Sequence, residues 1–153
     1  MSKKNTLDDM LRLAIEKEED AVRFYTQAAE IVTAPGTNEM LRSFITEEQK
    51  HVSLLSEARS GKSMEAVGQK SLPTSLDLTR YLVGGDITPA STAQDVMIIA
   101  MKKEDSAVAF YSDLGASFAG SEVEGIFQSL CKMEKEHKEQ LEAEYEKHFM
   151  PDN

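Results

Sequence analysis

The chain contains two copies of one acidic pattern, and the second copy stands 86 residues after the first. Each copy has a glutamate followed thirty residues later by a Glu-x-x-His step, and the six members are Glu18, Glu48, His51, Glu104, Glu134 and His137. On a helix, residues three apart lie on one face, so each step presents a carboxylate beside an imidazole. Four helices that carry these groups can close four carboxylates and two imidazoles around a pair of metal ions. The pattern therefore predicts a bundle of four helices around a metal site.

The same offset aligns further identical residues, which shows that the pattern belongs to a wider repeat. Aligned pairs include Thr6 with Thr92, Asp9 with Asp95, Lys17 with Lys103, Phe24 with Phe110 and Tyr25 with Tyr111. Most acidic residues have no acidic counterpart, as when Glu47 falls on Met133 and Glu57 on Ala143. Such drift is typical of a solvated face, so we interpret Glu47 as an exposed charge, in common with Glu16, Glu19, Asp20 and Glu136.

Composition indicates one domain over residues 1–153, a length that can bury a core and fold alone. The single cysteine, Cys131, excludes a Cys-x-x-Cys metal knuckle and suits a reducing cytosol. No apolar run approaches the roughly 20 residues of a membrane span, and the start lacks the apolar segment of a signal peptide. The formal charge of −10 argues against nucleic-acid or anionic-membrane partners. We therefore expect a cytoplasmic protein.

Helical periodicity and end signals predict four helices and one long connection. The first begins with the cap-type Thr6 and should end at Pro35-Gly36, and the others span about 37–59, 92–115 and 121–149. Short links make each half an antiparallel hairpin. The crossover over about 60–91 can reach a third helix that starts at either end of the bundle. The expected fold is an all-α antiparallel four-helix bundle with one long crossover between its second and third helices.

The predicted ligands lie among apolar or small residues. Glu18 shares its helix face with Ala14, Ala21 and Tyr25, and the repeat gives Glu104 the same setting. A buried carboxylate without a partner would cost several kcal/mol or stay protonated. Buried structural ion pairs are the alternative to a metal site. The small Ala21 and Ala107 leave room near the carboxylates for a bridging oxygen or a bound oxidant.

These segments resemble the ferritin-like di-iron carboxylate superfamily, and within it the rubrerythrin-related proteins. The resemblance covers all four helices and rests on residues 14–25 (Ala-Ile-Glu-Lys-Glu-Glu-Asp-Ala-Val-Arg-Phe-Tyr), 48–51 (Glu-Gln-Lys-His), 100–111 (Ala-Met-Lys-Lys-Glu-Asp-Ser-Ala-Val-Ala-Phe-Tyr) and 134–137 (Glu-Lys-Glu-His). It implies that Glu18 and Glu104 are terminal carboxylate ligands. The bridging carboxylates would be Glu48 and Glu134, and His51 and His137 would each give one nitrogen to an iron.

The chain departs from its relatives at three points. Rubrerythrins have a further glutamate three residues after the third-helix ligand, and it exchanges with a histidine when the iron changes oxidation state. In this chain Ala107 stands at that position. The symmetric set of six ligands is therefore more like the ferroxidase centre of bacterioferritins. They also carry a Cys-rich rubredoxin domain, which is lacking here, so electrons would come from an external donor such as a rubredoxin. Bacterioferritins bind haem through a methionine that Gln49 replaces, so no haem is expected.

Two tyrosines are candidates for a supporting role. Tyr25 and Tyr111 each follow a ligand glutamate by seven residues, two turns along the same face. Either hydroxyl could bond a ligand carboxylate on the neighbouring helix, as similar tyrosines do in the related proteins. Core packing with a satisfied hydroxyl is the alternative.

Carboxylate-rich sites with one imidazole per ion suit iron or manganese better than zinc or copper. We expect two Fe ions per chain, with Mn as the alternative. The leading function is a homodimeric di-iron oxidoreductase that reduces hydrogen peroxide or dioxygen in oxidative-stress defence. A second is a ferroxidase or iron-storage protein in a large hollow oligomer. A third is a non-catalytic interaction module clamped by metal.

Overall fold

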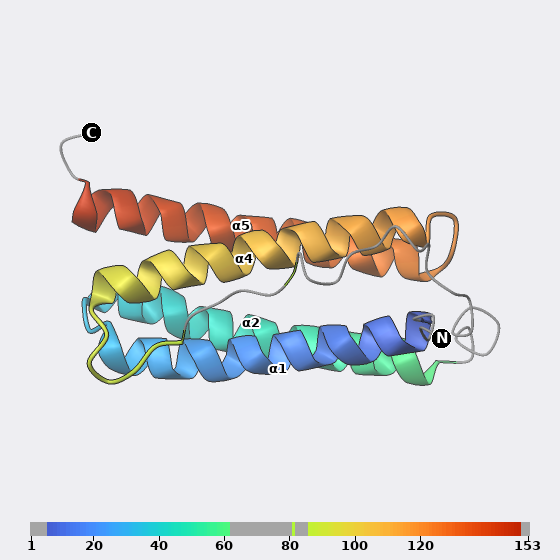
Figure 1. The fold of residues 1–153 in the computed structure, drawn as a ribbon, viewed down its shortest axis with the longest axis horizontal. Coiled ribbons are helices and arrows are strands. Elements are labelled where there is room, and N and C mark those ends of the chain that lie inside the picture. The colour runs from blue at the N-terminus through green and yellow to red at the C-terminus, as the bar shows by residue number, and fades with distance from the viewer. Residues whose placement is uncertain (1–5, 62–80, 82–85, 151–153) are drawn as a thin grey trace, which may run out of the picture.

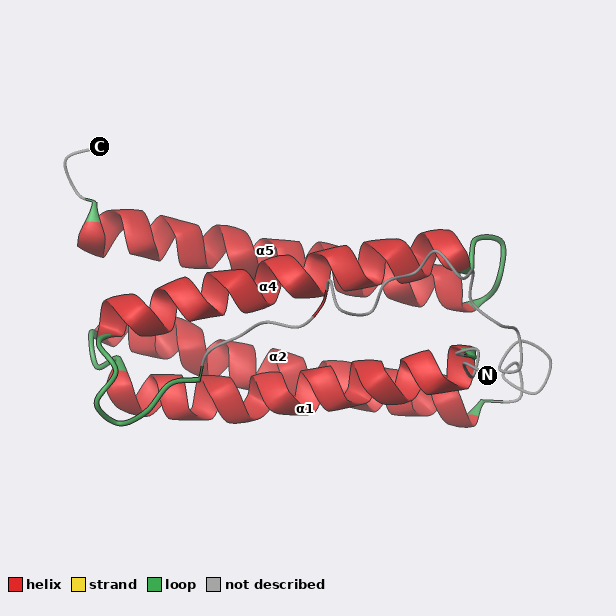
Figure 2. Ribbon diagram, viewed as in Figure 1, coloured by secondary structure: helices red, strands yellow, loops and turns green. Residues whose placement is uncertain are grey.

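The regular structure is helical throughout the part of the chain that the computed structural model describes, residues 6–61, 81 and 86–150. It consists of α1 (Leu7–Ile31), α2 (Pro35–Ser60), α4 (Ala93–Ser117) and α5 (Val123–Phe149). None of these described residues lies in a strand (Figure 2). The all-α prediction is confirmed. None of the described helices is both long and apolar enough to cross a membrane.

The two hairpins begin with the same local device. The Thr6 hydroxyl accepts from the backbone N–H of Asp9, whose carboxylate accepts in return from the Thr6 N–H. Thr92 and Asp95 make the same reciprocal pair at the start of α4. Such capping boxes satisfy backbone donors that have no partner inside the helix. The helix starts predicted at Thr6 and Thr92 are therefore confirmed.

The link between α1 and α2 differs from the prediction. Pro35 and Gly36 do not end the first helix, because α1 ends at Ile31 and Pro35 opens α2. Proline suits the first helical position, where its fixed φ fits the helix and its missing N–H would have no intrahelical partner. The other predicted ends agree to within two residues, and Gly120, at φ +85°, forms the turn before α5.

The helices form two antiparallel hairpins that lie side by side, α1 with α2 and α4 with α5 (Figure 1). The end of α2 and the start of α4 lie at opposite ends of the bundle, so α4 runs parallel to α2 and antiparallel to α1 (Figure 1). The structure thus shows at which end of the bundle the third helix starts, which the length of the predicted crossover left open. The predicted crossover, about 60–91, falls largely outside the described residues. The prediction of a four-helix bundle is confirmed.

The apolar core is divided into two clusters. One contains Leu11, Leu55 and Phe127, and the other contains Ala28, Phe44 and Leu141. The two clusters are separated along each helix by the glutamates and histidines of the repeat, which lie near the helix midpoints. The fold thus places a polar layer at the centre of the bundle, with one apolar cluster on either side of it along the bundle axis.

Candidate metal centre

The six residues predicted from the repeat are brought together in the middle of the bundle. Each is at most 3% exposed, and they are Glu18, Glu48, His51, Glu104, Glu134 and His137. Each helix contributes, because Glu18 comes from α1, the first Glu-x-x-His step from α2, Glu104 from α4 and the second step from α5. Burial of this much charge is costly unless the groups are paired or bind a metal ion.

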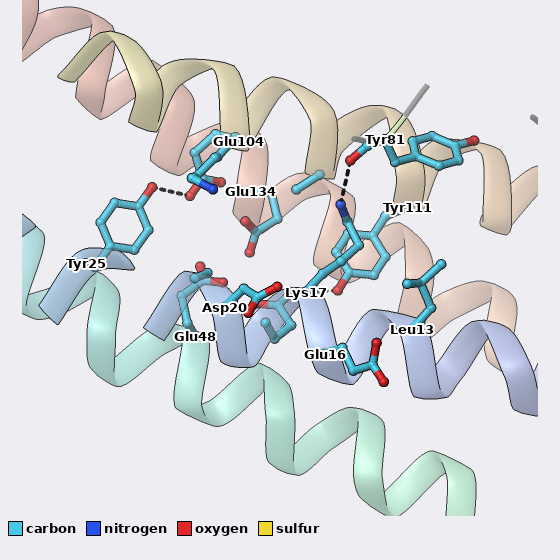
Figure 3. Close-up of a pocket in the computed structure, with 14 residues that line it drawn as sticks. Leu13, Glu16, Lys17, Asp20, Tyr25, Glu48, Tyr81, Glu104, Tyr111 and Glu134 are labelled. Carbon is cyan, nitrogen blue, oxygen red and sulfur yellow. Dashed lines mark hydrogen bonds between the residues drawn. The ribbon is translucent and has the colours of Figure 1, made fainter. Parts of the chain in front are cut away.

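The cluster divides into two overlapping groups, each of which could hold one metal ion. The first joins Glu18 and His51 to Glu48 and Glu134, and the second joins Glu104 and His137 to the same two glutamates. Within each group the candidate ligand atoms all lie within 4.8 Å of one another. In Figure 3, Glu48 and Glu134 approach each other from α2 and α5. Because both groups share these carboxylates, Glu48 and Glu134 are the two residues that would be available to both ions.

The histidine contacts follow the two-fold character of the repeat. His51 Nδ1 lies 2.9 Å from a Glu134 oxygen, and His137 Nδ1 lies 3.0 Å from a Glu48 oxygen. Nδ1 of His51 is 3.5 Å from Glu18, and Nδ1 of His137 is 3.6 Å from Glu104. Both rings therefore turn Nδ1 toward the carboxylates.

Several of these buried atoms lack a hydrogen bond despite their proximity. Among the described residues, both Glu48 oxygens, one oxygen each of Glu18, Glu104 and Glu134, and Nδ1 of both histidines have no hydrogen-bond partner. Buried polar groups in folded proteins are nearly always satisfied, so such a set needs a physical explanation. Oxygen and nitrogen atoms that converge without hydrogen-bond geometry are arranged as ligands around a shared centre. The residues present thus fit a pair of metal ions.

The pKa values of the buried carboxyl groups are shifted in opposite directions, although burial raises all of them. Burial raises the pKa of Glu18 to about 8, and the neighbouring Glu48 adds to the shift. Burial also raises the pKa of Glu134 well above its usual value, with Glu104 acting in the same direction. Burial acts likewise on Glu48, but contacts with Glu18 and both histidines outweigh it and lower its pKa. Without metal, the cluster therefore holds protons on some carboxyl groups at neutral pH.

Both imidazoles are more basic than usual. Burial opposes their charged form, yet Glu18 and Glu48 outweigh it and raise the pKa of His51 to about 9. In the same way, Glu104 and Glu48 outweigh burial and raise the pKa of His137 to about 11. Protons on the rings partly neutralise the four carboxyl groups in the metal-free cluster. Metal ions would displace these protons, because they bind neutral imidazole and ionised carboxylate.

The two tyrosines bind the outer glutamates across the hairpin interface. Tyr25 on α1 donates its hydroxyl proton to Glu104 at 2.5 Å (Figure 3). Tyr111 on α4 donates to Glu18 at 2.6 Å. Burial and the neighbouring carboxylates raise the pKa of both phenols well above its usual value. The hydroxyls therefore remain protonated donors that fix the orientation of the two carboxylates.

We expect Tyr25→Phe or Tyr111→Phe to lower the free energy of unfolding by about 1.5–3 kcal/mol each, the range for a hydrogen bond to a charged group. Each change removes a donor from a buried carboxylate. Urea denaturation of the metal-loaded protein would measure the loss. Tyr145→Phe is the matched control, because the exposed Tyr145 hydroxyl bonds Gln94 at 3.0 Å and its loss should cost little. Stabilities equal to wild type in both buried variants would contradict the role of the hydroxyls.

A cavity of about 430 Å³ adjoins the carboxylate side of the cluster. It reaches Glu18, Glu48, Glu104 and Glu134, and its wall includes the small side chains of Ala21 and Ala107. Lys17 and Lys103 also line it, and each ammonium lies over a phenylalanine ring, 5.4 Å from the centre of Phe110 and 5.2 Å from that of Phe24. Small molecules therefore have space to reach the cluster from this side.

One residue of the site differs from the prediction. Glu47 was expected to be an exposed charge, but its carboxylate is hydrogen-bonded to Nε2 of the buried His137. The Glu47 side chain is 43% exposed, so it joins the cluster to the surface. No signal in the sequence separates Glu47 from the other acids that lack an acidic counterpart, since Met133 at the equivalent position is the pattern expected of a solvated face.

Fold and site together define a ferritin-like helical bundle with a buried carboxylate and histidine centre suited to two metal ions. The rubrerythrin family pattern matches residues 9–145, nearly the whole chain. The chain therefore belongs to the rubrerythrin family. None of the curated proteins compared with the chain matches it.

Two solved structures are similar over most of their length. A hypothetical protein from Pyrococcus furiosus has a TM-score of 0.71 at 27% identity, covering 92% of this chain and 89% of that one. A protein from Thermotoga maritima, described as a ferritin-like diiron-carboxylate protein, has a TM-score of 0.73 at 20% identity, covering 97% and 99%. At that identity, the second likeness shows the fold alone.

Proposed function

We propose that this protein is a di-iron oxidoreductase that reduces hydrogen peroxide or dioxygen. The observation that carries the proposal is the convergence of unpaired buried carboxylate and imidazole atoms beside an open cavity. Family membership and the ferritin-like fold support it, because both are associated with carboxylate-bound metal pairs. The six residues would hold two ions per chain, one in each overlapping group.

The donor set favours iron, with manganese as the alternative. Each group offers three carboxylates and one imidazole, a set that suits iron or manganese better than zinc or copper. A ferrous pair bound by these residues would supply two electrons, one from each ion, for the reduction of the oxidant. The two ions would also offset the negative charge of the four buried glutamates, which removes the main cost of the site.

The chain's own residues hold the site and keep it accessible. Glu48 and Glu134 would fix the spacing of the ions, while Tyr25 and Tyr111 orient Glu104 and Glu18. The cavity gives the oxidant a route to the carboxylate side. The cavity volume is about 430 Å³, whereas one water molecule occupies roughly 30 Å³ in the liquid. Dioxygen and peroxide are only slightly larger than water, so either fits easily.

We expect ferrous protein to be oxidised rapidly by hydrogen peroxide or dioxygen, but to turn over only with an external electron donor such as a rubredoxin. The chain has a single cysteine, too few for the Cys₄ site of an iron–sulfur donor. Stopped-flow absorbance of anaerobically loaded protein would measure oxidation. A peroxide assay with and without added reduced rubredoxin would measure turnover.

Matched controls separate the two parts of this expectation. Zinc-loaded protein has an inert metal at the same site and should show neither oxidation nor turnover. Sustained turnover with NADH alone would contradict the need for a donor protein. A ferrous protein that shows no spectral change with either oxidant would instead favour a non-catalytic metal clamp.

Ferroxidation coupled to iron storage is the second candidate. The near two-fold symmetry of the cluster favours this function, because a symmetric ligand set resembles the ferroxidase centre of bacterioferritins. The equivalent histidine contacts differ by only about 0.1 Å. Storage requires a large hollow assembly, whereas the proposed oxidoreductase needs only a homodimer. Size-exclusion chromatography with light scattering would distinguish the two, because a dimer would exclude storage in a cage.

A further inference from the structure

The repeat gives the two histidines equivalent inner contacts but different outer ones. On the inner side, His51 Nδ1 approaches Glu134 at 2.9 Å and His137 Nδ1 approaches Glu48 at 3.0 Å. Because Nδ1 of each ring faces the carboxylates, Nε2 is the atom left to interact with the surrounding protein. The two Nε2 atoms have different surroundings.

His137 Nε2 is hydrogen-bonded to the carboxylate of Glu47 on α2. His51 Nε2 is also buried, but it has no hydrogen-bond partner among the described residues. The repeat places Met133 where Glu47 would have its counterpart on α5, and a thioether offers no carboxylate to the second ring. The symmetry of the cluster therefore breaks at one position in each hairpin.

A second contact distinguishes the same ring. Phe44 of α2 stacks on His137, with ring centres 4.0 Å apart and an angle of 22° between the planes. The repeat places the aliphatic Leu130 at the equivalent position of α5. A stacked ring on one face and a carboxylate at Nε2 together fix the plane and the tautomer of His137. Neither constraint is available to His51 from the equivalent residues.

We propose that Glu47 is a positioning residue that makes the two metal positions unequal, so that the ion bound through His137 is held more tightly than the ion bound through His51. A carboxylate that accepts the Nε2 proton keeps the Nδ1 lone pair facing the metal and makes the ring a stronger ligand. This inference rests on the di-metal site of the proposed function. It adds an order of loading, in which the His137 position fills first.

Manganese(II) titration of the metal-free protein, followed by calorimetry and by the electron paramagnetic resonance of free manganese, would test the proposal without catalysis. Wild type should bind two ions in two resolved steps. Loss of partners of this kind weakens metal affinity roughly 10- to 100-fold, so Glu47→Met should weaken the tighter step by about that factor. The total of two ions should remain, because Glu47 is not itself a predicted ligand.

Three further variants separate positioning from general effects of charge. Glu47→Gln removes the same charge but keeps an acceptor oxygen, so it should restore part of the lost affinity. Met133→Glu should strengthen the weaker step by supplying His51 with the missing carboxylate. Glu136→Met changes an exposed carboxylate beside His137 in sequence and should leave both steps unchanged.

The outcomes are distinct for this inference and for the site on which it rests. Two ions bound by Glu47→Met in two steps of unchanged affinity would overturn the positioning role. An equal loss in Glu47→Gln and Glu47→Met would also overturn it, because charge alone would then explain the effect. Fewer than two ions bound by wild type would instead contradict the di-metal function. Circular dichroism of each apo variant would show that the fold is retained.

Discussion

Replacing Glu48 or Glu134 by alanine is expected to lower the bound metal from two ions per chain to one or none. The two groups of candidate ligands overlap only at these glutamates, so each substitution removes a ligand from both positions. Both side chains are at most 2% exposed, and among the described residues both Glu48 oxygens lack a hydrogen-bond partner. Elemental analysis of protein loaded with ferrous iron and then desalted would give the stoichiometry.

The other carboxylates provide graded controls. Glu18 and Glu104 each belong to one group only, so Glu18→Ala should remove one ion and keep the other. Exposed Glu136, two residues after Glu134, should be replaceable by glutamine with both ions retained. Two tightly bound ions in both Glu48→Ala and Glu134→Ala would show that neither carboxylate bridges the metals.

The sequence alone could predict the six central residues because two independent constraints act on them. Helical periodicity places Glu18 and Glu104 on apolar faces, and the repeat shows that these acids persist where most others drift. The helix starts were equally readable, since the capping pairs Thr6 with Asp9 and Thr92 with Asp95 are local in sequence. Local spacing therefore carries most of the information about which residues face the core.

The contact of Glu47 with His137 could not be read from spacing. It joins residues 90 positions apart on different hairpins, and it depends on how α2 and α5 are rotated about their axes. Glu47 directly precedes Glu48 and lies at the edge of the buried face, where a small rotation decides between solvent and cluster. The direction of α4 was undetermined for a related reason. The chain between the hairpins is long enough to reach either end of the bundle.

Metal-free protein is expected to lose stability as pH rises from about 5 to about 9. Glu18 has a pKa raised from 4.5 to about 8, so its protonated form is favoured by the fold. Its contribution is fully present below pH 4.5 and is lost as pH rises through about 8. His51, raised from 6.5 to about 9, contributes with the same sign over the upper part of this range.

Glu48 has the opposite effect on the pH dependence of stability, and it makes the metal-free protein less stable at acid pH. Its pKa is lowered, so its contribution is present above its ordinary value of 4.5 and is lost as pH falls below it. The metal-free protein should therefore be most stable near pH 5. Thermal melts in the presence of a chelator, recorded by circular dichroism at intervals from about pH 4 to 9, would locate this maximum.

Metal-loaded protein should behave differently, because metal binds the ionised carboxylates and neutral imidazoles and its affinity rises as protons leave. The stabilisation by metal should therefore grow between about pH 5 and 8. Free metal at 100 to 1,000 times its dissociation constant stabilises by roughly 2.7–4.1 kcal/mol, which corresponds to about 5–16 °C in Tm for a chain of this size. The double variant Glu48→Ala with Glu134→Ala should lose most of this metal-dependent gain. Superimposable melting curves with and without chelator at every pH would mean that the six residues do not form a metal site.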